Sequence, residues 1–490
     1  MQTTEIGQFE ERMTSALGFT PTPSQRVAIR GLSMLVRSVK PRPTLVIDGF
    51  AGTGKTSLMR SFCDAASDFG VPVVLLAPTG RAAKVLANYT HRSAYTIHRI
   101  IYRQSGPDPN SDFDRSYNKW RGAVFVVDEA SMVGDSYAAD SDSTGPIWGG
   151  GRLLSDVVDF VFSQEWSKLV FIGDPDQLPP VGCTASPALD VAYLKSMGLT
   201  VGRVRLTDVV RQQAGSLILA NALNLRGLIE TPTPAEDLPE LMARDGADVE
   251  PSGGEGFQEQ IEGAFSEFGL CDVVLVTRSN KRATLYNLAI RSQVLNYEDM
   301  LVKGDLLIVN KNNYLWSAKA GCDFIANGDI AEVVSIFGYS EMYGLHFADV
   351  SVRLIDRDDI DVDCKILLDL LTADVEVPDT EAGVSKCQTS KEILDKLSQG
   401  AEEDYADYTN QRKKALDMRN DPWLNALQVR YAYALTCHKA QGGQWGAVFV
   451  DTGYIPPEAD PQEFARWLYT AVSRAQSKLY VINYPKLVSP

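Results

Sequence analysis

The fold is decided by one stretch, Asp48-Gly49-Phe50-Ala51-Gly52-Thr53-Gly54-Lys55-Thr56. The apolar run Thr44–Ile47 precedes it and the helix-like stretch Ser57–Phe62 follows it, so a strand, a glycine-rich loop and a helix start are expected in succession. That order is the context that a G-x-x-x-x-G-K-[ST] phosphate loop requires. The glycines let successive N–H groups point at phosphate oxygens, and the helix N-terminus adds partial positive charge. The stretch therefore predicts an α/β fold with a site for a nucleoside triphosphate.

Two side chains of this loop have evident chemistry. Lys55 can reach the β- and γ-phosphates, and the hydroxyl of Thr56 can ligate Mg²⁺. The alternative is a chance glycine-rich turn, but all four fixed positions of the pattern are matched in the expected context. The residues expected to contact the nucleotide here are Gly49, Ala51, Gly52, Thr53, Gly54, Lys55 and Thr56.

The composition is that of a globular chain of several domains. Its 490 residues are 44% hydrophobic and 22% charged, enough for roughly three or four domains. No apolar run of about 18 residues and no secretion signal is evident. The seven cysteines form no C-x-x-C pair, which favours reduced thiols over disulfides or zinc. We therefore expect a cytoplasmic protein that does not associate with membranes.

The net charge of −16 is unevenly distributed. Residues 230–267 hold eleven acidic and one basic residue, and residues 356–407 hold sixteen acidic and five basic residues. These segments carry net charges of −10 and −11, which leaves +5 for the rest of the chain. The first segment resembles an acidic linker. The overall acidity therefore does not exclude a basic groove for nucleic acid.

A second strand pattern, Gly122–Val127, ends in the carboxylates Asp128 and Glu129. In a phosphate-loop ATPase such a pair lies beside the metal: Asp128 would hold it through water, and Glu129 would orient or deprotonate the attacking water. Acidic pairs at strand ends also occur by chance. This pair, however, follows Lys55 by 73 residues with another strand pattern between, which favours the functional interpretation.

Three further side chains are candidates for contacts with the transferring phosphoryl group. Gln177 follows the strand pattern Lys168–Ile172, and its amide could read the γ-phosphate or a water molecule. Arg211 and Arg474 are candidate arginine fingers, although Arg211 taken alone would more often be a surface arginine.

Other candidates have plainer alternatives. Gln25 could read adenine, or it could be a surface glutamine. His98 follows Thr96, and a lone histidine is usually structural. Residues 103–121 interleave aromatic with basic residues, which suits either base stacking by an inserted hairpin or an ordinary surface loop.

The C-terminal half changes its periodicity twice. Residues 302–355 contain short β segments broken by Gly and Asn, which predict a small barrel, and residues 365–420 are polar and lean towards helix. Strand character returns at Leu427–Leu435, followed by Thr436, His438 and Lys439 in a turn suited to sugar–phosphate contacts.

Taken in order, these motifs resemble those of superfamily 1 helicases, specifically the 5′→3′ branch that includes RecD and the phage Dda proteins. The segment Gly173–Gly182 has the form G-D-x-x-Q-L-P-P-V-G, which is highly specific. The matching segments are Gln25 (Q motif), Gly49–Thr56 (I), Ala77–Lys84 (Ia), Thr96–His98 (T-x-H), Asp128–Glu129 (II), Gly173–Gly182 (III), Arg211–Gln212 (IV), Thr436–Gly442 with Trp445 (V) and Tyr469–Ala475 (VI).

The resemblance implies two RecA-like parallel-sheet domains, a small SH3-like β-barrel inserted in the second and a small hairpin inserted in the first. The first RecA-like domain is expected at residues 1–200, with the hairpin at 99–121. The second is expected at 201–295 and 425–490, interrupted at 296–424 by the barrel and an acidic helical extension. Whether that extension belongs to the barrel or serves a partner is left open.

The resemblance also implies an ATP-dependent, Mg²⁺-requiring DNA helicase that moves along single-stranded DNA, 5′ to 3′, in replication, recombination or repair. Alternatives are a translocase that remodels protein–DNA complexes and a nuclease-associated helicase. A replication or single-strand-binding protein could dock on the acidic segments. The implied catalytic residues are Lys55, Asp128, Glu129, Gln177, Arg211 and Arg474, with Gln25 and Gly442 at the nucleotide. The implied contacts with single strands and their junctions are Pro78, Thr79, Arg81, Thr96, His98, Phe113 (as a strand-separating wedge), Thr436, His438, Lys439 and Trp445.

Overall fold

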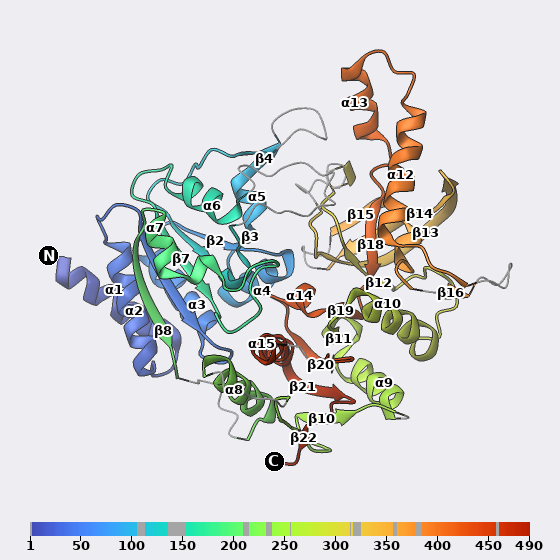
Figure 1. Cartoon of the computed structure of the whole chain (residues 1–490). Helices are drawn as coiled ribbons and strands as arrows, with labels where there is room; N and C mark the ends of the chain where they lie inside the picture. The colour runs from blue at the N-terminus through green and yellow to red at the C-terminus, as the bar shows by residue number, and fades with distance from the viewer. Residues whose placement is uncertain are drawn as a thin grey trace. The chain divides into compact units, whose positions relative to one another are not determined.

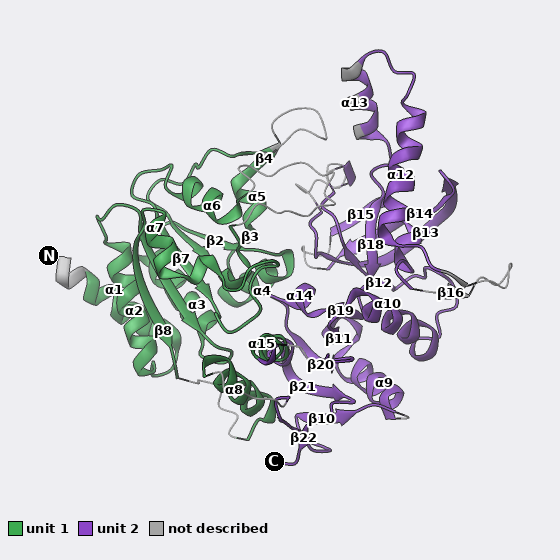
Figure 2. Cartoon of the chain, viewed as in Figure 1, with its two compact units in different colours: residues 1–106, 111–234, 462–470 green, residues 107–110, 235–461, 471–490 purple. Residues whose placement is uncertain are grey.

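The chain folds into two compact units, shown in Figure 1 and coloured separately in Figure 2. Unit 1 comprises residues 1–106, 111–234 and 462–470, and unit 2 comprises mainly residues 235–461 and 471–490. No helix in the described part of the chain is long and apolar enough to cross a membrane. The computed structural model describes residues 2–104, 113–135, 152–208, 215–231, 238–254, 256–313, 315–316, 325–355, 360–375, 377–378, 385–456 and 460–490.

Unit 1 is built on a sheet of six parallel strands. Strands β1, β6 and β7 are buried along their whole length, as expected for parallel strands covered on both faces. Because all six strands run the same way, their carboxyl ends share one edge, where the phosphate loop and the segments after β6 and β7 begin. In sheet order the strands are β3 (Ala94–Thr96), β2 (Val73–Ala77), β6 (Val124–Val127), β7 (Lys168–Gly173), β1 (Pro43–Gly49) and β8 (Thr200–Leu206).

The helices of unit 1 share a hydrophobic core with this sheet, in which Phe9, Leu32 and Phe62 are buried against strand residues such as Ile47 and Val126. Strand β8 and the helix after it lie beyond residue 200, where the sequence placed the domain boundary. Strand β8 belongs to unit 1 because it pairs with β1 at every residue of β1, and the helix after it clusters with the same unit. The domain division as a whole stays a prediction. The helices are α1 (Gln2–Leu17), α2 (Pro23–Val36), α3 (Lys55–Asp68), α4 (Gly80–Thr90), α5 (Ile97–Ile101), η1 (Ala130–Met132), α6 (Leu153–Val161), η2 (Pro187–Leu189), α7 (Val191–Ser196) and α8 (Leu217–Glu230).

A hairpin in unit 1 connects α5 to β6. Strands β4 (Tyr102–Gln104) and β5 (Phe113–Arg115) pair antiparallel, which confirms the predicted small hairpin insertion. Its backbone is held to the rest of the unit by the Ser116 N–H, which donates to the carbonyl of Ile101 (2.8 Å), and by the buried Tyr102.

Unit 2 contains a second parallel sheet, of five strands. The acidic segment 230–267 was expected to be a linker, and this prediction is wrong. It includes a strand that pairs with β21, a helix and half of a two-stranded ribbon, because Leu241, Val249, Ile261 and Ala264 are buried. In sheet order the strands are β10 (Val249–Ser252), β21 (Ala475–Ile482), β20 (Trp445–Asp451), β11 (Val273–Thr277) and β19 (Ala434–Thr436); the ribbon is β9 (Leu241–Met242) with β22 (Leu487–Val488). The helices are α9 (Gly256–Phe268), η3 (Leu270–Asp272), α10 (Asn280–Ala289), η4 (Ile290–Val294) and α14 (Cys437–Ala440). Helix α15 (Pro461–Val472) follows in the chain, but its residues 462–470 cluster with unit 1.

A closed barrel of five strands interrupts unit 2, as predicted. The stretch Leu427–Leu435 was expected to belong to the second sheet, but only its end does. Its first part closes the barrel by pairing with β12 and β15, and a turn at Ala432–Tyr433 leads to β19. The barrel strands are β12 (Leu306–Val309), β13 (Ile330–Met342), β14 (Leu345–Leu354), β15 (Ile360–Leu367) and β18 (Leu427–Tyr431).

The acidic extension belongs to the barrel through β15 and α12. Strand β15 is a barrel strand, and α12 packs Ile393 and Leu397 into one apolar cluster with Phe347 and Leu367. These observations confirm the predicted fold class: two RecA-like parallel sheets, an inserted small barrel and a hairpin. The remaining elements are η5 (Leu368–Leu371), β16 (Val377–Pro378), β17 (Ser385–Lys386), α12 (Ser390–Asp404) and α13 (Gln411–Asn420).

Candidate nucleotide and nucleic-acid site

The phosphate loop connects the end of β1 to the start of α3. Gly52 and Gly54 adopt φ angles of 84° and 80°, a left-handed conformation that glycine adopts without strain. A Cβ atom at Gly49 would lie 2.8 Å from the Cβ of Leu206, so strand β8 leaves no room for a side chain there. Gly54 caps α3 without a side-chain hydrogen bond. The first N–H groups of this helix are thus not capped by a side chain, as an anion site requires.

Lys55 turns back over the loop that precedes it. Its Nζ donates to the carbonyl oxygens of Gly49 (2.5 Å) and Phe50 (3.0 Å). Thr56, the next residue of α3, is half-buried. Both partners are backbone carbonyls, which the ammonium group can exchange for phosphate oxygens, and the predicted role needs that exchange.

Gln25 is completely buried, so the alternative that it is a surface glutamine is wrong. Its Oε1 accepts from the N–H of Thr22 (3.1 Å) in a capping box at the start of α2. Its Nε2 donates to the carbonyl of Thr53 in the phosphate loop (3.0 Å). The structure therefore brings Gln25 to the nucleotide loop, while its reading of adenine stays a prediction.

Asp128 and Glu129 follow β6 at the same edge of the sheet. Burial and the neighbouring carboxylate of Glu129 raise the pKa of Asp128 to about 7, and Lys55 acts in the opposite direction. Glu129 has a φ of 50°, which is uncommon for a residue with a side chain, and it is the N-cap of η1. Asp128 is therefore placed where a cation from outside the chain would favour its ionised form.

Gln177 lies in the loop after β7. Asp174 shapes this loop, because its carboxylate accepts from the N–H of Asp176 (3.1 Å) and its carbonyl accepts from the N–H of Gln177 (3.3 Å). Gln177 is 4% exposed, and its Oε1 has no hydrogen-bond partner within the described residues. Buried acceptors are almost always paired, so this atom fits a donor supplied by a bound molecule.

The described residues contain no group of three or more His, Cys, Asp or Glu side chains that could hold a metal ion. The predicted Mg²⁺ site, Thr56 and Asp128, does not need one. Mg²⁺ at nucleotide sites is held by one or two protein ligands and completes its octahedron with phosphate oxygens and water. The hydroxyl and the carboxylate present here fit that requirement.

The predicted DNA contacts of unit 1 lie at the carboxyl ends of the adjacent strands β2 and β3. Thr79 and Thr96 both act as helix N-caps: their hydroxyls accept from the N–H groups of Ala82 (3.2 Å) and Arg99 (3.4 Å). Pro78 and Arg81 are half-buried beside Thr79. The structure thus brings these residues together, and each cap accounts for its threonine without DNA.

His98 packs its ring against Tyr102, with ring centroids 5.6 Å apart. Burial lowers the pKa of His98 to about 4, so it is uncharged at neutral pH. Phe113, the predicted wedge, begins β5, where its backbone pairs with Gln104. The side chain of Phe113 lies outside the described residues, and so does Arg211.

In unit 2, the structure brings the predicted motif VI arginine to the predicted motif V turn. Arg474 is 3% exposed and donates to the carbonyl of Gly443 (3.1 Å), and the preceding Gly442 has a φ of 75°. The N–H of Trp445 donates to the carbonyl of Arg474 (3.0 Å). These contacts hold the turn and the arginine as one structural group.

The other predicted DNA contacts of unit 2 differ in exposure. His438 is exposed and Thr436 half-buried at the start of α14. Lys439 donates to Asn310 Oδ1 (2.5 Å), and burial followed by the nearby Arg430 lowers its pKa to about 8. Trp445 is 3% exposed within the sheet, which does not favour base stacking, because a stacking ring must be exposed.

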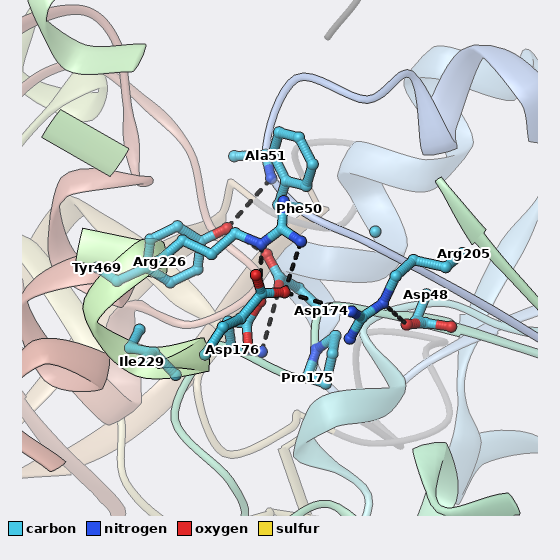
Figure 3. Close-up of polar contacts among 12 residues, drawn as sticks. Asp48, Phe50, Ala51, Asp174, Pro175, Asp176, Arg205, Arg226, Ile229 and Tyr469 are labelled. Carbon is cyan, nitrogen blue, oxygen red and sulfur yellow. Dashed lines mark hydrogen bonds and ion pairs between the residues drawn. The ribbon is translucent and has the colours of Figure 1, made fainter. Parts of the chain in front are cut away.

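Polar and charged residues that had not been predicted as site residues surround the phosphate loop, and several of them are drawn in Figure 3. Asp48 accepts from Arg205 Nε (3.0 Å) and bidentately from Arg203, which is two residues earlier in the adjacent strand (both 2.9 Å). The alternation of arginines in β8 was a signal for such a partner. Arg226 and Tyr469 reach the loop from α8 and α15, and nothing in their local sequence indicates that contact.

Two family models match the chain. The model described as "AAA domain" matches residues 22–141, and the model described as "UvrD-like helicase C-terminal domain" matches residues 431–482. The first match contains the phosphate loop with Asp128 and Glu129, and the second contains Gly442 and Arg474. The two matches thus fall on the two RecA-like parts.

Curated relatives match parts of the chain. The ATP-dependent RecD2 DNA helicase of Deinococcus radiodurans is 32% identical over 211 residues, 43% of this chain and 24% of that protein. The ATP-dependent DNA helicase dda of phage T4 is 28% identical over 179 residues, 35% of each. The chain spans 12% to 35% of the length of the curated relatives it matches. Together with the family models, these relatives confirm the resemblance to superfamily 1 helicases of the RecD and Dda type.

Among solved structures, the Pif1 helicase of Candida albicans matches with a TM-score of 0.46 and 16% identity, over 96% of this chain and 97% of that one. A Bacteroides Pif1 helicase in complex with ADP-AlF3 and single-stranded DNA matches with a TM-score of 0.46 and 13% identity, over 95% and 93% of the two chains.

Proposed function

We propose that the chain is an ATP-dependent DNA helicase that moves along single-stranded DNA from 5′ to 3′ and separates duplex ahead of it. One observation carries the proposal: the phosphate loop, Asp128–Glu129 and the loop of Gln177 begin at the carboxyl edge of one parallel sheet. In open α/β sheets this edge is where ligands bind. The resemblance to RecD and Dda helicases supports this class of reaction and the proposed direction.

In the proposed hydrolysis, the residues of unit 1 have separate roles. Lys55 and the N–H groups at the start of α3 bind the phosphates, Glu129 orients or deprotonates a water, and the buried amide oxygen of Gln177 accepts a hydrogen bond from it. Thr56 and Asp128 would hold Mg²⁺, which supplies positive charge to the phosphate oxygens.

The proposed reaction cycle also uses two cationic side chains in addition to the unit 1 residues named above. We assign Arg211 and Arg474 to stabilise charge on the transferring phosphoryl group, as arginine fingers do. Hydrolysis would then change the grip on the strand by the contact residues Thr79, Thr96 and His438, and repeated cycles would give directed steps.

The deciding experiment compares unwinding of two partial duplexes that differ only in overhang. We expect ATP-dependent unwinding of the substrate with a 5′ single-stranded overhang and none of the substrate with a 3′ overhang. Unwinding of only the 3′ substrate would overturn the direction. ATP hydrolysis that does not respond to single-stranded DNA would overturn the helicase assignment.

The control variant is Lys55→Ala. It removes the phosphate-binding ammonium, so ATP hydrolysis and unwinding should both disappear, whereas binding of labelled single-stranded DNA should persist. Retained hydrolysis in this variant would refute the assignment of the nucleotide site.

A further inference from the structure

Two loops of the candidate nucleotide site are joined by a tyrosine of α15. The hydroxyl of Tyr469 donates to Asp174 Oδ2 (2.5 Å) and accepts from the N–H of Ala51 in the phosphate loop (3.3 Å), as Figure 3 shows. Tyr469 is 1% exposed, and burial and the Asp174 carboxylate raise its pKa well above the usual value. The hydroxyl therefore keeps its proton and bridges the two loops as donor and acceptor.

Neighbouring residues on the same face of α15 hold the same loop. Arg466 donates to the carbonyl of Pro175 (2.7 Å), and the Thr470 hydroxyl accepts from the N–H of Leu178 (2.9 Å). Their spacing of three and four residues places these side chains together along the helix. Residues 462–470 of α15 cluster with unit 1, whereas the chain on either side belongs to unit 2.

A second bridge between the two loops comes from α8. The guanidinium of Arg226 lies over the ring of Phe50, 4.1 Å from its centroid, and its Nε donates to Asp176 Oδ2 (3.2 Å). Glu230, one turn later in α8, accepts from the same guanidinium (2.6 Å). The Arg226 side chain is only 15% exposed, so solvent screens these contacts weakly.

We propose that Tyr469 and Arg226 are positioning residues that hold the phosphate loop and the loop of Gln177 in fixed register. The inference rests on the proposed ATPase function. Tyr469 holds the carboxylate of Asp174, and the carbonyl of Asp174 in turn accepts from the N–H of Gln177. Neither positioning residue needs to touch ATP: each sets the distance between the groups that bind phosphate and the amide that orients water.

Such a role predicts a specific kinetic signature. Displacements of about 1 Å from a catalytic geometry can cost about 10²-fold in rate, whereas phosphate binding depends mainly on Lys55 and the loop itself. Loss of one bridge should therefore lower kcat more than it weakens ATP binding. A residue that merely stabilises the fold would change neither in the folded protein.

The test uses the full chain with Tyr469→Phe, which removes one oxygen atom. We expect kcat for DNA-stimulated ATP hydrolysis to fall about tenfold, with the Kd for ATP changed by less than about threefold. The matched control is Tyr484→Phe, which removes a similarly buried hydroxyl bound to the carbonyl of Pro239 (2.6 Å) in unit 2. It should lower the melting temperature as much as Tyr469→Phe while kcat is unchanged.

Arg226→Met tests the second bridge and should lower kcat by the same factor. Its control is Arg121→Met, which removes an exposed ion pair with Glu165. Unchanged kcat in both Tyr469→Phe and Arg226→Met would overturn the inference, and so would an affinity loss without a kcat loss. An inactive wild-type chain would instead refute the proposed function and, with it, this inference.

Discussion

Asp48, in β1, and Asp128, after β6, are carboxylates at the same edge of the first sheet, two strands apart, yet their electrostatic environments are opposite. Asp48 is completely buried. Burial would raise its pKa, but the hydrogen bonds and charges of Arg203 and Arg205 outweigh burial and lower it below the usual value. Asp128 has no such arginine pair among the residues that the structure describes, and burial with the adjacent Glu129 raises its pKa to about 7.

The difference shows that two carboxylates at one edge of a sheet can have different roles, one structural and one in ligand binding. The charge of Asp48 is neutralised within the chain, so this carboxylate joins β1 to β8. The charge of Asp128 is not neutralised in this way, and such groups cluster where a cation or substrate is bound. Three experiments can break or sharpen this contrast.

The largest effect is expected for Asp128→Asn on catalysis. In the proposed function Asp128 holds the metal ion, so its loss should lower kcat for ATP hydrolysis by about 10²–10³-fold, because several kcal/mol of charge stabilisation are lost. The folded chain should not become less stable, since the amide removes a charge that burial disfavours. Steady-state hydrolysis and thermal melting check both parts, and a kcat within about tenfold of the wild type would contradict the metal-holding role.

A smaller effect, on stability, is expected for Asp48→Ala. It leaves Arg203 and Arg205 without their partner, but both side chains are partly exposed, at 42% and 44%, and can be solvated. We expect a loss of about 2 kcal/mol in the free energy of unfolding, below the range for fully buried pairs. Chemical denaturation measures it, with Glu165→Ala at an exposed pair as the control that should change little. Equal losses in the two variants would contradict the contrast.

A third effect is a pH dependence of stability in metal-free protein. Because the folded-state pKa of Asp128 is raised, the folded chain binds more protons than the unfolded chain between about pH 4 and 7, and stability falls as pH rises through that window. Asp128→Asn removes this pH dependence. The melting temperature of the variant relative to that of the wild type should therefore rise from pH 5 to pH 8, by about 2–4 °C for each kcal/mol of stability that the wild type loses. A constant difference across this range would show that Asp128 ionises without penalty.

Asp48 contributes with the opposite sign. Its lowered pKa stabilises the fold above the usual aspartate value, and that stability is lost as pH falls through the folded-state pKa. The two carboxylates therefore act in different pH windows, which lets one set of melting curves separate them.

Local sequence pattern was sufficient for most of the candidate nucleotide site. Short stretches of sequence predict the phosphate loop, the Asp128–Glu129 pair and the hairpin, because the residues that form each feature are close together in the chain. The structure has strands and helices at the predicted places. The errors arose where pairing is not local. The acidic segment 230–267 hides β10, whose partner β21 lies more than 200 residues later, and β18 joins the barrel although it directly precedes a strand of the second sheet.

The sequence by itself determined the phosphate loop, its glycines and the types of residue that meet a triphosphate, because backbone turns and charge at a helix start depend on neighbours in the chain. Only the tertiary structure decided which charges are neutralised internally and which are left for a ligand. That outcome depends on packing between distant segments: Arg203 on Asp48, Arg226 on Asp176 and Tyr469 on Asp174. Burial and pairing across such distances set the energy of each charge, and no local pattern encodes them.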